Sequence, residues 1–206
     1  MRLLLSVLLI VLVSALCGCA TLNKNECLYA NWKAIGLEDG AKGRNLSYLS
    51  RHRKACAKHG VIPDATLYMS GYEIGLMQFC TPERGFTLGL GGAGYSGICP
   101  DELERDFLFA YQQGYEIYQA ERQVKKIVDW LLDQENYLAD LHAEIKETRA
   151  HIISDKTPKK VRAKLLKDLD LLKNEIAETR DEIHRLKRHK RAAIDHLNLL
   201  RYHAGL

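Results

Sequence analysis

Hydrophobic residues recur in the second half of the chain at alternating steps of three and four positions. One series spans residues 124–152, a second spans 165–200, and the segment 154–158 between them contains a proline. Such steps form one apolar stripe along a helix, as in coiled coils. Two matched stripes joined by a short turn predict an antiparallel coiled-coil hairpin over residues 119–203, with its turn near 154–158.

Charge along the two predicted helices favours the same pairing. Residues 101–155 hold thirteen acidic and six basic residues, whereas residues 156–203 hold seven acidic and fourteen basic ones. The two helices therefore attract each other, although an exposed ion pair contributes less than about 1 kcal/mol. The acids at positions 101, 102, 104 and 106 also mark a helix start, because carboxylates interact favourably with the positive end of the helix dipole.

One group of bases departs from this complementary pattern. The register of the two stripes places eight bases at one end of the hairpin, relieved mainly by Glu121 and Asp129. They are Arg122, Lys125, Lys126, Arg185, Lys187, Arg188, Lys190 and Arg191. We expect either a solvated basic surface or a contact patch for anionic lipid head groups, peptidoglycan carboxylates or an acidic envelope protein.

The chain begins with an apolar run. Leu3 to Leu16 form a stretch of 14 residues, preceded by the positive charge of Arg2. A relaxed membrane-spanning helix takes about 20 residues, so this shorter run has the length of a secretory signal. The run ends in Leu16-Cys17-Gly18-Cys19, which resembles the bacterial lipobox.

That resemblance implies cleavage after Gly18 and lipidation of Cys19. Residues 1–18 are then a signal peptide and residues 19–26 a lipidated tether. Ala20, at the position after the lipidated cysteine, favours delivery to the outer membrane, facing the periplasm. An uncleaved membrane helix and a soluble secreted product are the alternatives. A periplasmic location argues against nucleic acid as a partner.

The segment 22–100 has weak periodicity and many turn residues. We predict a helix from Tyr48 to His59, capped by Asn45 or Ser47 and ended by Gly60. A second helix begins near Pro63-Asp64, and residues 85–97, with six glycines, are predicted to be a loop. A phosphate- or glycan-binding role for that loop is the alternative, but a lone glycine-rich run is a weak signal.

Pairs of glycines four positions apart recur in this segment. Gly36/Gly40 and Gly71/Gly75 each share one face if their segments are helical. Each glycine costs roughly 1 kcal/mol of helix propensity. We therefore expect another backbone or an aromatic ring to pack closely on these faces.

Four cysteines remain in the predicted mature chain: Cys27, Cys56, Cys80 and Cys99. An even number in an oxidising compartment predicts two disulfides, for which three pairings exist. We prefer Cys27–Cys56 and Cys80–Cys99, because each bond then closes one local loop. A zinc site of His52, Cys56 and His59 is the alternative, but no second cluster completes it. We expect no metal or other cofactor.

The order of these motifs resembles a known family. The motifs are Cys27, Trp32-x2-Ile35-Gly36-x2-Asp39-Gly40, Cys56-x3-Gly60-x2-Pro63-Asp64, Tyr68-x2-Gly71-x3-Gly75 and Gly94-Tyr95-x3-Cys99-Pro100. They are similar to those of an uncharacterised family of proteobacterial envelope lipoproteins that share a domain of unknown function. The resemblance covers residues 27–118 and implies a location and a modular layout, but no activity.

The fold expected from the sequence is therefore all-α, with a small disulfide-stapled domain followed by the hairpin. A catalytic constellation is not visible. Asp39, Asp64 and Glu73 are candidate acid–base groups, but turn and cap roles suit Asp39 and Asp64 better. We expect a non-catalytic structural or partner-binding protein. The alternatives are an envelope enzyme that uses those acids, and a glycan or lipid binder that uses the aromatic side chains of Trp32, Tyr68, Tyr72 and Tyr95.

Overall fold

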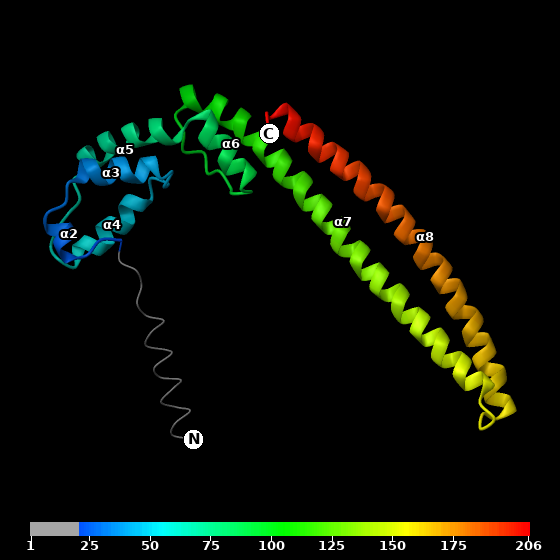
Figure 1. The fold of residues 1–206 in the computed structure, drawn as a ribbon. Coiled ribbons are helices and arrows are strands. Elements are labelled where there is room, and N and C mark those ends of the chain that lie inside the picture. The colour runs from blue at the N-terminus through cyan, green and yellow to red at the C-terminus, as the bar shows by residue number, and fades with distance from the viewer. Residues whose placement is uncertain (1–20) are drawn as a thin grey trace, which may run out of the picture. The chain divides into compact units, whose positions relative to one another are not determined.

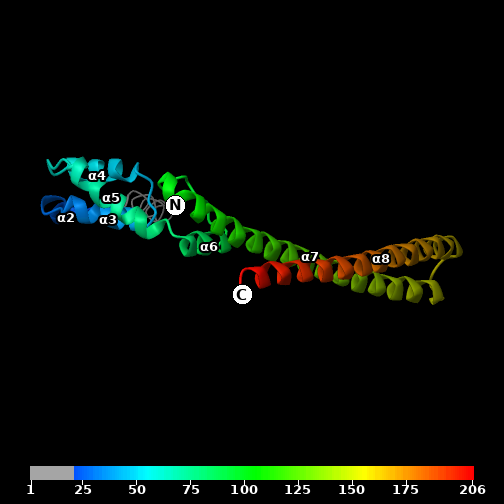
Figure 2. The same cartoon turned by 90° about the horizontal axis from the view of Figure 1, so that it is seen from above.

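The computed structural model describes residues Thr21–Leu206, which are helical with no strand in that range (Figures 1 and 2). The predicted signal peptide and the lipidation site Cys19 lie outside the described residues. From Thr21 onward, none of the helices combines the length and the apolar character needed to cross a membrane.

The chain divides into two compact units. The first comprises residues up to Thr87 together with Gly94–Tyr111, and the second comprises Leu88–Ala93 together with Gln112–Leu206. The helices are, in chain order, α2 (Lys24–Leu28), α3 (Trp32–Ala41), α4 (Tyr48–Ala57), α5 (Ala65–Phe79), α6 (Pro82–Leu90), α7 (Asp101–Ile153) and α8 (Lys159–His203).

The first unit is built on α3 and α5, whose backbones touch through the four glycines. A Cβ atom at Gly36 would lie 2.0 Å from the carbonyl oxygen of Tyr68, and one at Gly40 would lie 2.2 Å from that of Tyr72. From the other side, a Cβ at Gly71 would lie 1.9 Å from the carbonyl oxygen of Lys33. The predicted close approach is thus confirmed, with backbone rather than aromatic rings on these glycine faces.

Side-chain caps fix where several of these helices start. Asn23 caps α2 in a capping box with Glu26, and Asn31 caps α3 by accepting from the Ala34 N–H. Asp64 accepts a hydrogen bond from the Leu67 N–H at 2.9 Å and caps α5, as its position after Pro63 predicts. Each cap satisfies a backbone N–H that has no partner inside its own helix.

The helix α4 follows the prediction in its position but not in its cap. Ser47 makes no side-chain capping bond, and the Asn45 side chain accepts from the Ser47 N–H at 3.0 Å instead. The helix ends at Ala57, and Gly60, with φ of 70°, follows it. A left-handed residue of this kind turns the chain away from the helix axis at little cost when it is glycine.

The prediction that residues 85–97 form a loop was wrong for its first half. The helix α6 continues to Leu90, with Pro82 and Glu83 in its first turn and Thr81 accepting from the Arg84 N–H at 3.2 Å. Gly85 lies inside α6, where a Cβ would be 2.3 Å from the carbonyl oxygen of Phe107. Gly85 therefore allows close helix packing. In the sequence, a glycine of this kind looks the same as a loop glycine in a glycine-rich run.

Both disulfides join neighbouring cysteines in chain order, the pairing preferred above. Cys27 bonds to Cys56 and Cys80 bonds to Cys99, across sequence separations of 29 and 19 residues. The first links α2 to α4, and the second links the end of α5 to the segment before α7. Loops of this size are expected to contribute on the order of 3 kcal/mol each through the entropy of the unfolded chain. Cys56 is therefore not available as a zinc ligand.

The second unit contains most of α7 and all of α8, which lie side by side (Figures 1 and 2). Leu141 and Ile145 of α7 form one buried cluster with Leu169, Leu172 and Ile176 of α8. A second cluster joins Leu131 to Ile183 and Leu186, with Ile127 packed against it. Every position of the two predicted stripes is buried or partly buried. The stripes are therefore the surfaces through which the two helices pack.

The turn between these helices also lies where the proline predicted it. The helix α7 ends at Ile153, and α8 begins at Lys159, directly after Pro158. The Arg162 guanidinium donates to the carbonyl oxygens of Ser154 at 3.0 Å and Thr157 at 3.4 Å. These bonds tie the first turn of α8 to the connection between the two helices.

Candidate functional site

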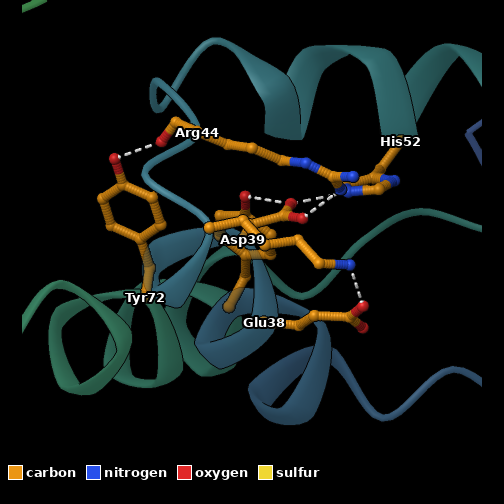
Figure 3. A network of polar contacts seen from close by, with 7 residues as sticks. Glu38, Asp39, Arg44, His52 and Tyr72 are labelled. Carbon is orange, nitrogen blue, oxygen red and sulfur yellow. Dashed lines mark hydrogen bonds and ion pairs between the residues drawn. The ribbon is translucent and has the colours of Figure 1, made fainter. Parts of the chain in front are cut away.

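A buried carboxylate, Asp39, is the most unusual polar group of the first unit. It lies in α3 with only 1% of its surface exposed. His52 Nε2 lies 2.8 Å from its Oδ2, and the Tyr68 hydroxyl donates to the same oxygen at 2.7 Å. Arg44 Nη1 donates to Oδ1 at 2.6 Å. Figure 3 shows the side chains of Arg44 and His52 converging on this carboxylate.

Three elements besides α3 position this cluster, which we define as Asp39, Arg44, His52 and Tyr68. His52 comes from the buried side of α4, and Tyr68 from α5. Arg44 follows Gly43, whose φ of 68° turns the chain after α3 so that the Arg44 N–H donates to the Asp39 carbonyl oxygen at 2.9 Å. A side chain at position 43 would also meet the ring of Phe79. The Asp39 cluster therefore ties α3, α4, α5 and the α3–α4 connection together.

The hydrogen bonds of the cluster outweigh the effect of burial on Asp39. Burial by itself raises the pKa of this carboxyl, but the bonds from His52, Tyr68 and Arg44 together hold its pKa below the usual value. Burial and the bond to Asp39 raise the pKa of the Tyr68 hydroxyl well above its ordinary range. The folded state thus holds a carboxylate and a neutral phenol at this position.

An aspartate–histidine pair is also a common catalytic arrangement, so access decides its role here. His52 is 2% exposed and Tyr68 is fully buried. The second ring nitrogen of His52, Nδ1, is buried and has no hydrogen-bond partner within Thr21–Leu206. A substrate cannot reach a carboxylate and an imidazole enclosed in this way. The Asp39 cluster holds the fold together and is not an open active site.

The other two candidate acids, Asp64 and Glu73, make no hydrogen bond or ion pair with the Asp39 cluster. Asp64 caps α5, as expected, and Glu73 is exposed on α5. Asp39 does not fill the predicted turn role, because it lies inside α3 and faces the core. The signal that could have revealed it is its place between Gly36 and Gly40, on the face that packs against α5. A paired-carboxylate site therefore does not form.

Most of the candidate aromatic side chains are also in the core. Trp32 is 7% exposed, Tyr68 is fully buried and Tyr72 is 4% exposed. The Tyr72 hydroxyl donates to the Arg44 carbonyl oxygen at 2.7 Å. Tyr95 donates to Glu104 and accepts from the Cys99 N–H, both at 2.9 Å. These rings do not form a platform on which a sugar or a lipid could stack.

The eight candidate bases of the second unit lie on α7 and α8, and three of the eight are in ion pairs. Lys125 pairs with Asp129 at 3.1 Å, Lys187 pairs with Glu135 at 2.9 Å, and Arg185 pairs with Glu182. Glu121 does not relieve the group as expected, because it pairs with Arg201 at 2.8 Å.

The remaining five bases have no ion pair within Thr21–Leu206 and form what we call the free basic set. They are Arg122, Lys126, Arg188, Lys190 and Arg191. All except Lys190 are exposed. The Arg122 guanidinium lies 6.0 Å from the centre of the Tyr118 ring, which in turn covers Gly92. The free basic set therefore carries positive charge without an ion-pair partner, on two helices whose apolar stripes already pack against each other.

From Thr21 to Leu206, no group of three or more histidine, cysteine, aspartate or glutamate side chains is placed so that it could hold a metal ion.

Comparison with known proteins adds a domain but no activity. No curated protein and no solved structure matches the chain. The matched domain includes the α3–α5 packing, the Asp39 cluster and the Cys80–Cys99 bond, and it ends within α7. Residues 31–116 of this chain match the model of the DUF2799 family, which is described as a protein of unknown function.

Proposed function

We propose that this protein is a lipid-anchored component of the bacterial envelope with a non-catalytic, partner-binding role. In this proposal, Cys19 carries the lipid, and the protein is delivered to the outer membrane, where it faces the periplasm. The helices α7 and α8 form an antiparallel coiled-coil arm, and the arm binds an acidic partner in the envelope. The alternative roles have less support. The Asp39 cluster is enclosed, which disfavours an enzyme that uses this acid, and the candidate aromatic rings are mostly buried, which disfavours a glycan binder.

The observation that carries this proposal is the free basic set. Bases that serve only to pair two helices are expected to face acids across the interface, as Lys187 faces Glu135. The five free bases do not, and neighbouring like charges are unfavourable unless something else compensates them. An acidic protein surface, peptidoglycan carboxylates or anionic lipid head groups supply that compensation.

In-cell photocrosslinking tests the arm. A photoreactive residue in place of Arg188 is expected to give a defined crosslinked product in intact cells. Reversing Arg122, Lys126 and Arg191 to glutamate in the same chain is expected to reduce that product at least about tenfold, because attraction becomes repulsion. The matched control reverses the exposed bases Lys156, Lys159 and Lys160 near the turn, which is expected to leave the product unchanged.

An equal loss of the Arg188 product in both reversed chains would contradict a role for the free basic set. The same crosslinked product from a probe at Lys160 would show that contact does not depend on this surface.

The anchor has a separate test. Cells fed a labelled fatty acid are expected to label the wild-type protein, and Cys19→Ser is expected to abolish the label and to release the protein from washed membranes, because a single thiol carries the attachment. The control Cys17→Ser is expected to keep both the label and the membrane association. A wild-type protein without label that washes away freely would overturn the anchor.

A further inference from the structure

The first unit has a basic surface of its own, separate from the arm. Between residues 40 and 63 the chain contains six lysines and arginines and no acid. Lys42 and Arg44 pair with Glu38 and Asp39. The other four, on α4 and at its C-cap, are exposed and have no ion pair within the described chain: Arg51, Arg53, Lys54 and Lys58. Because His52, Ala55 and Cys56 form the buried side of α4, the outer side of this helix is a row of positive charge.

Large apolar side chains are exposed at one end of the same helix. Tyr29 is 85% exposed, Ile62 is 83% exposed and Leu28 is 48% exposed. Leu28 and Tyr29 directly follow Cys27, which is bonded to Cys56 at the end of α4. The Val61 N–H donates to the carbonyl oxygen of that same Cys56 at 3.2 Å, which brings Ile62 close to the disulfide. The Cys27–Cys56 bond thus gathers three exposed apolar residues beside the basic row.

We propose that this face, made of α4 with Tyr29 and Ile62, lies on an anionic phospholipid surface. Tyr29 and Ile62 enter the boundary between head groups and acyl chains, and the four bases bind lipid phosphates. Exposed apolar side chains next to a basic helix face are the combination that binds such interfaces, and tyrosine is enriched at them. An acidic protein surface would also supply negative charge for the bases, but it accounts less well for the exposed apolar side chains of Tyr29 and Ile62.

The predicted anchor places this face within reach of lipid, and in this respect the inference rests on the proposed function. Asn23 caps α2, and Cys27 is part of the disulfide. Three residues separate Cys19 from Asn23, and the four Cα-to-Cα steps between them span at most about 14 Å in an extended chain. The start of α2 is therefore held close to the bilayer that the acyl chains enter, and the Cys27–Cys56 end of the unit is only one helical turn further along.

Fluorescence quenching by brominated lipids measures this contact directly. The full mature chain with Ile62→Trp is reconstituted into vesicles of phosphatidylcholine alone, or with about one third phosphatidylglycerol. We expect the added tryptophan signal, taken as the difference from the parent chain, to be quenched at least about threefold more in the anionic vesicles, and this excess to vanish in 1 M salt, where screening is strong. The matched control is Ile153→Trp, 80% exposed in the second unit, whose quenching is expected to be weak in both vesicles.

A charge-reversed chain separates lipid docking from a general charge effect. Arg53→Glu, Lys54→Glu and Lys58→Glu together are expected to remove the excess quenching of the tryptophan at position 62. Reversal of Lys156, Lys159 and Lys160, which changes the net charge equally, is expected to preserve it. All six side chains are exposed, so both chains are expected to keep the fold, which far-ultraviolet circular dichroism checks.

Equal quenching in neutral and anionic vesicles, or no quenching at position 62, overturns the proposal. These results differ from failure of the anchor, because co-sedimentation with vesicles in high salt and acyl labelling at Cys19 report the anchor separately. If the acyl chains are missing, quenching in anionic vesicles still supports the docking face, and its absence still overturns it. A protein crosslinked from position 62 in cells, without quenching in vesicles, assigns the face to a protein partner and overturns the lipid assignment.

Discussion

Replacing Gly71 by alanine is expected to lower the free energy of unfolding of the first unit by about 3 kcal/mol or more, a large fraction of the total stability of a small domain. A Cβ at this position would lie 1.9 Å from the carbonyl oxygen of Lys33 and 2.9 Å from the backbone nitrogen of Leu37. Both atoms belong to the backbone of α3, so relief requires α3 to move away from α5. That movement also disturbs the Asp39 cluster, whose side chains come from both helices.

The sign of this change in stability distinguishes close backbone packing from simple helix propensity. In an exposed helix, glycine to alanine is stabilising by about 1 kcal/mol, because alanine has the higher helix propensity. Denaturant unfolding followed by circular dichroism is the measurement. The control is Gly94→Ala, where a Cβ meets no atom within 4 Å, and a change within about 0.5 kcal/mol is expected. An increase in stability for Gly71→Ala would show that α3 and α5 do not pack through these backbones.

Replacing Asp39 by asparagine is expected to lower the stability of the first unit by about 2–4 kcal/mol. The carboxylate accepts hydrogen bonds from Tyr68 and Arg44 and contacts His52, and all three interactions favour the charged form. An asparagine amide keeps one acceptor oxygen but places an NH₂ group against donors. His52 and Tyr68 then remain buried with incomplete hydrogen bonding.

Stability at low pH provides a second measurement on the same residue. Because the folded state holds the pKa of Asp39 below its usual value of 3.8, its contribution is complete above about pH 4 and is lost as pH falls through the folded pKa. The wild-type unit is therefore expected to lose stability more steeply below pH 4 than Asp39→Asn does. Tyr68 affects stability at high pH. Because its pKa is raised in the folded state, its contribution to the free energy of unfolding is complete below about pH 10 and becomes smaller above it.

The neighbouring residue supplies the control for both measurements. Glu38 pairs with Lys42 at the surface, and its side chain is 63% exposed. Glu38→Gln is expected to change stability by less than about 1 kcal/mol and to leave the acid limb of the pH profile unchanged. If Asp39→Asn and Glu38→Gln behaved alike, the Asp39 cluster would not be a stabilising element.

Much of the helical architecture could be predicted because its signals are local. The stripes of α7 and α8 repeat over many turns, and Pro158 marks the start of α8, so sequence spacing alone located the buried positions. Each cysteine bonds to its neighbouring cysteine along the chain, and the glycine pairs predicted a close contact between helices. In each case the evidence lay within one element or between adjacent ones.

The errors arose where the deciding partner is distant in sequence. Asp39 suited a turn when considered beside Gly40 alone, but its role depends on His52, 13 residues away, and on Tyr68, 29 residues away. Gly85 suited a loop because its partner, the Phe107 backbone, comes from another helix. Glu121 was assigned to its neighbouring bases, but it pairs with Arg201, 80 residues further on. Contacts between residues this far apart in the chain have no local pattern in a single sequence from which they could be predicted.

The order of the two disulfides has a consequence for biogenesis. Each bond joins a cysteine to the next one along the chain, so neither loop encloses a cysteine of the other. On the proposed export route, an oxidase that joins thiols in the order in which they emerge from a translocon makes only native bonds. Correct oxidation then requires no shuffling enzyme, and cells that lack their disulfide isomerase should accumulate this protein at an undiminished level.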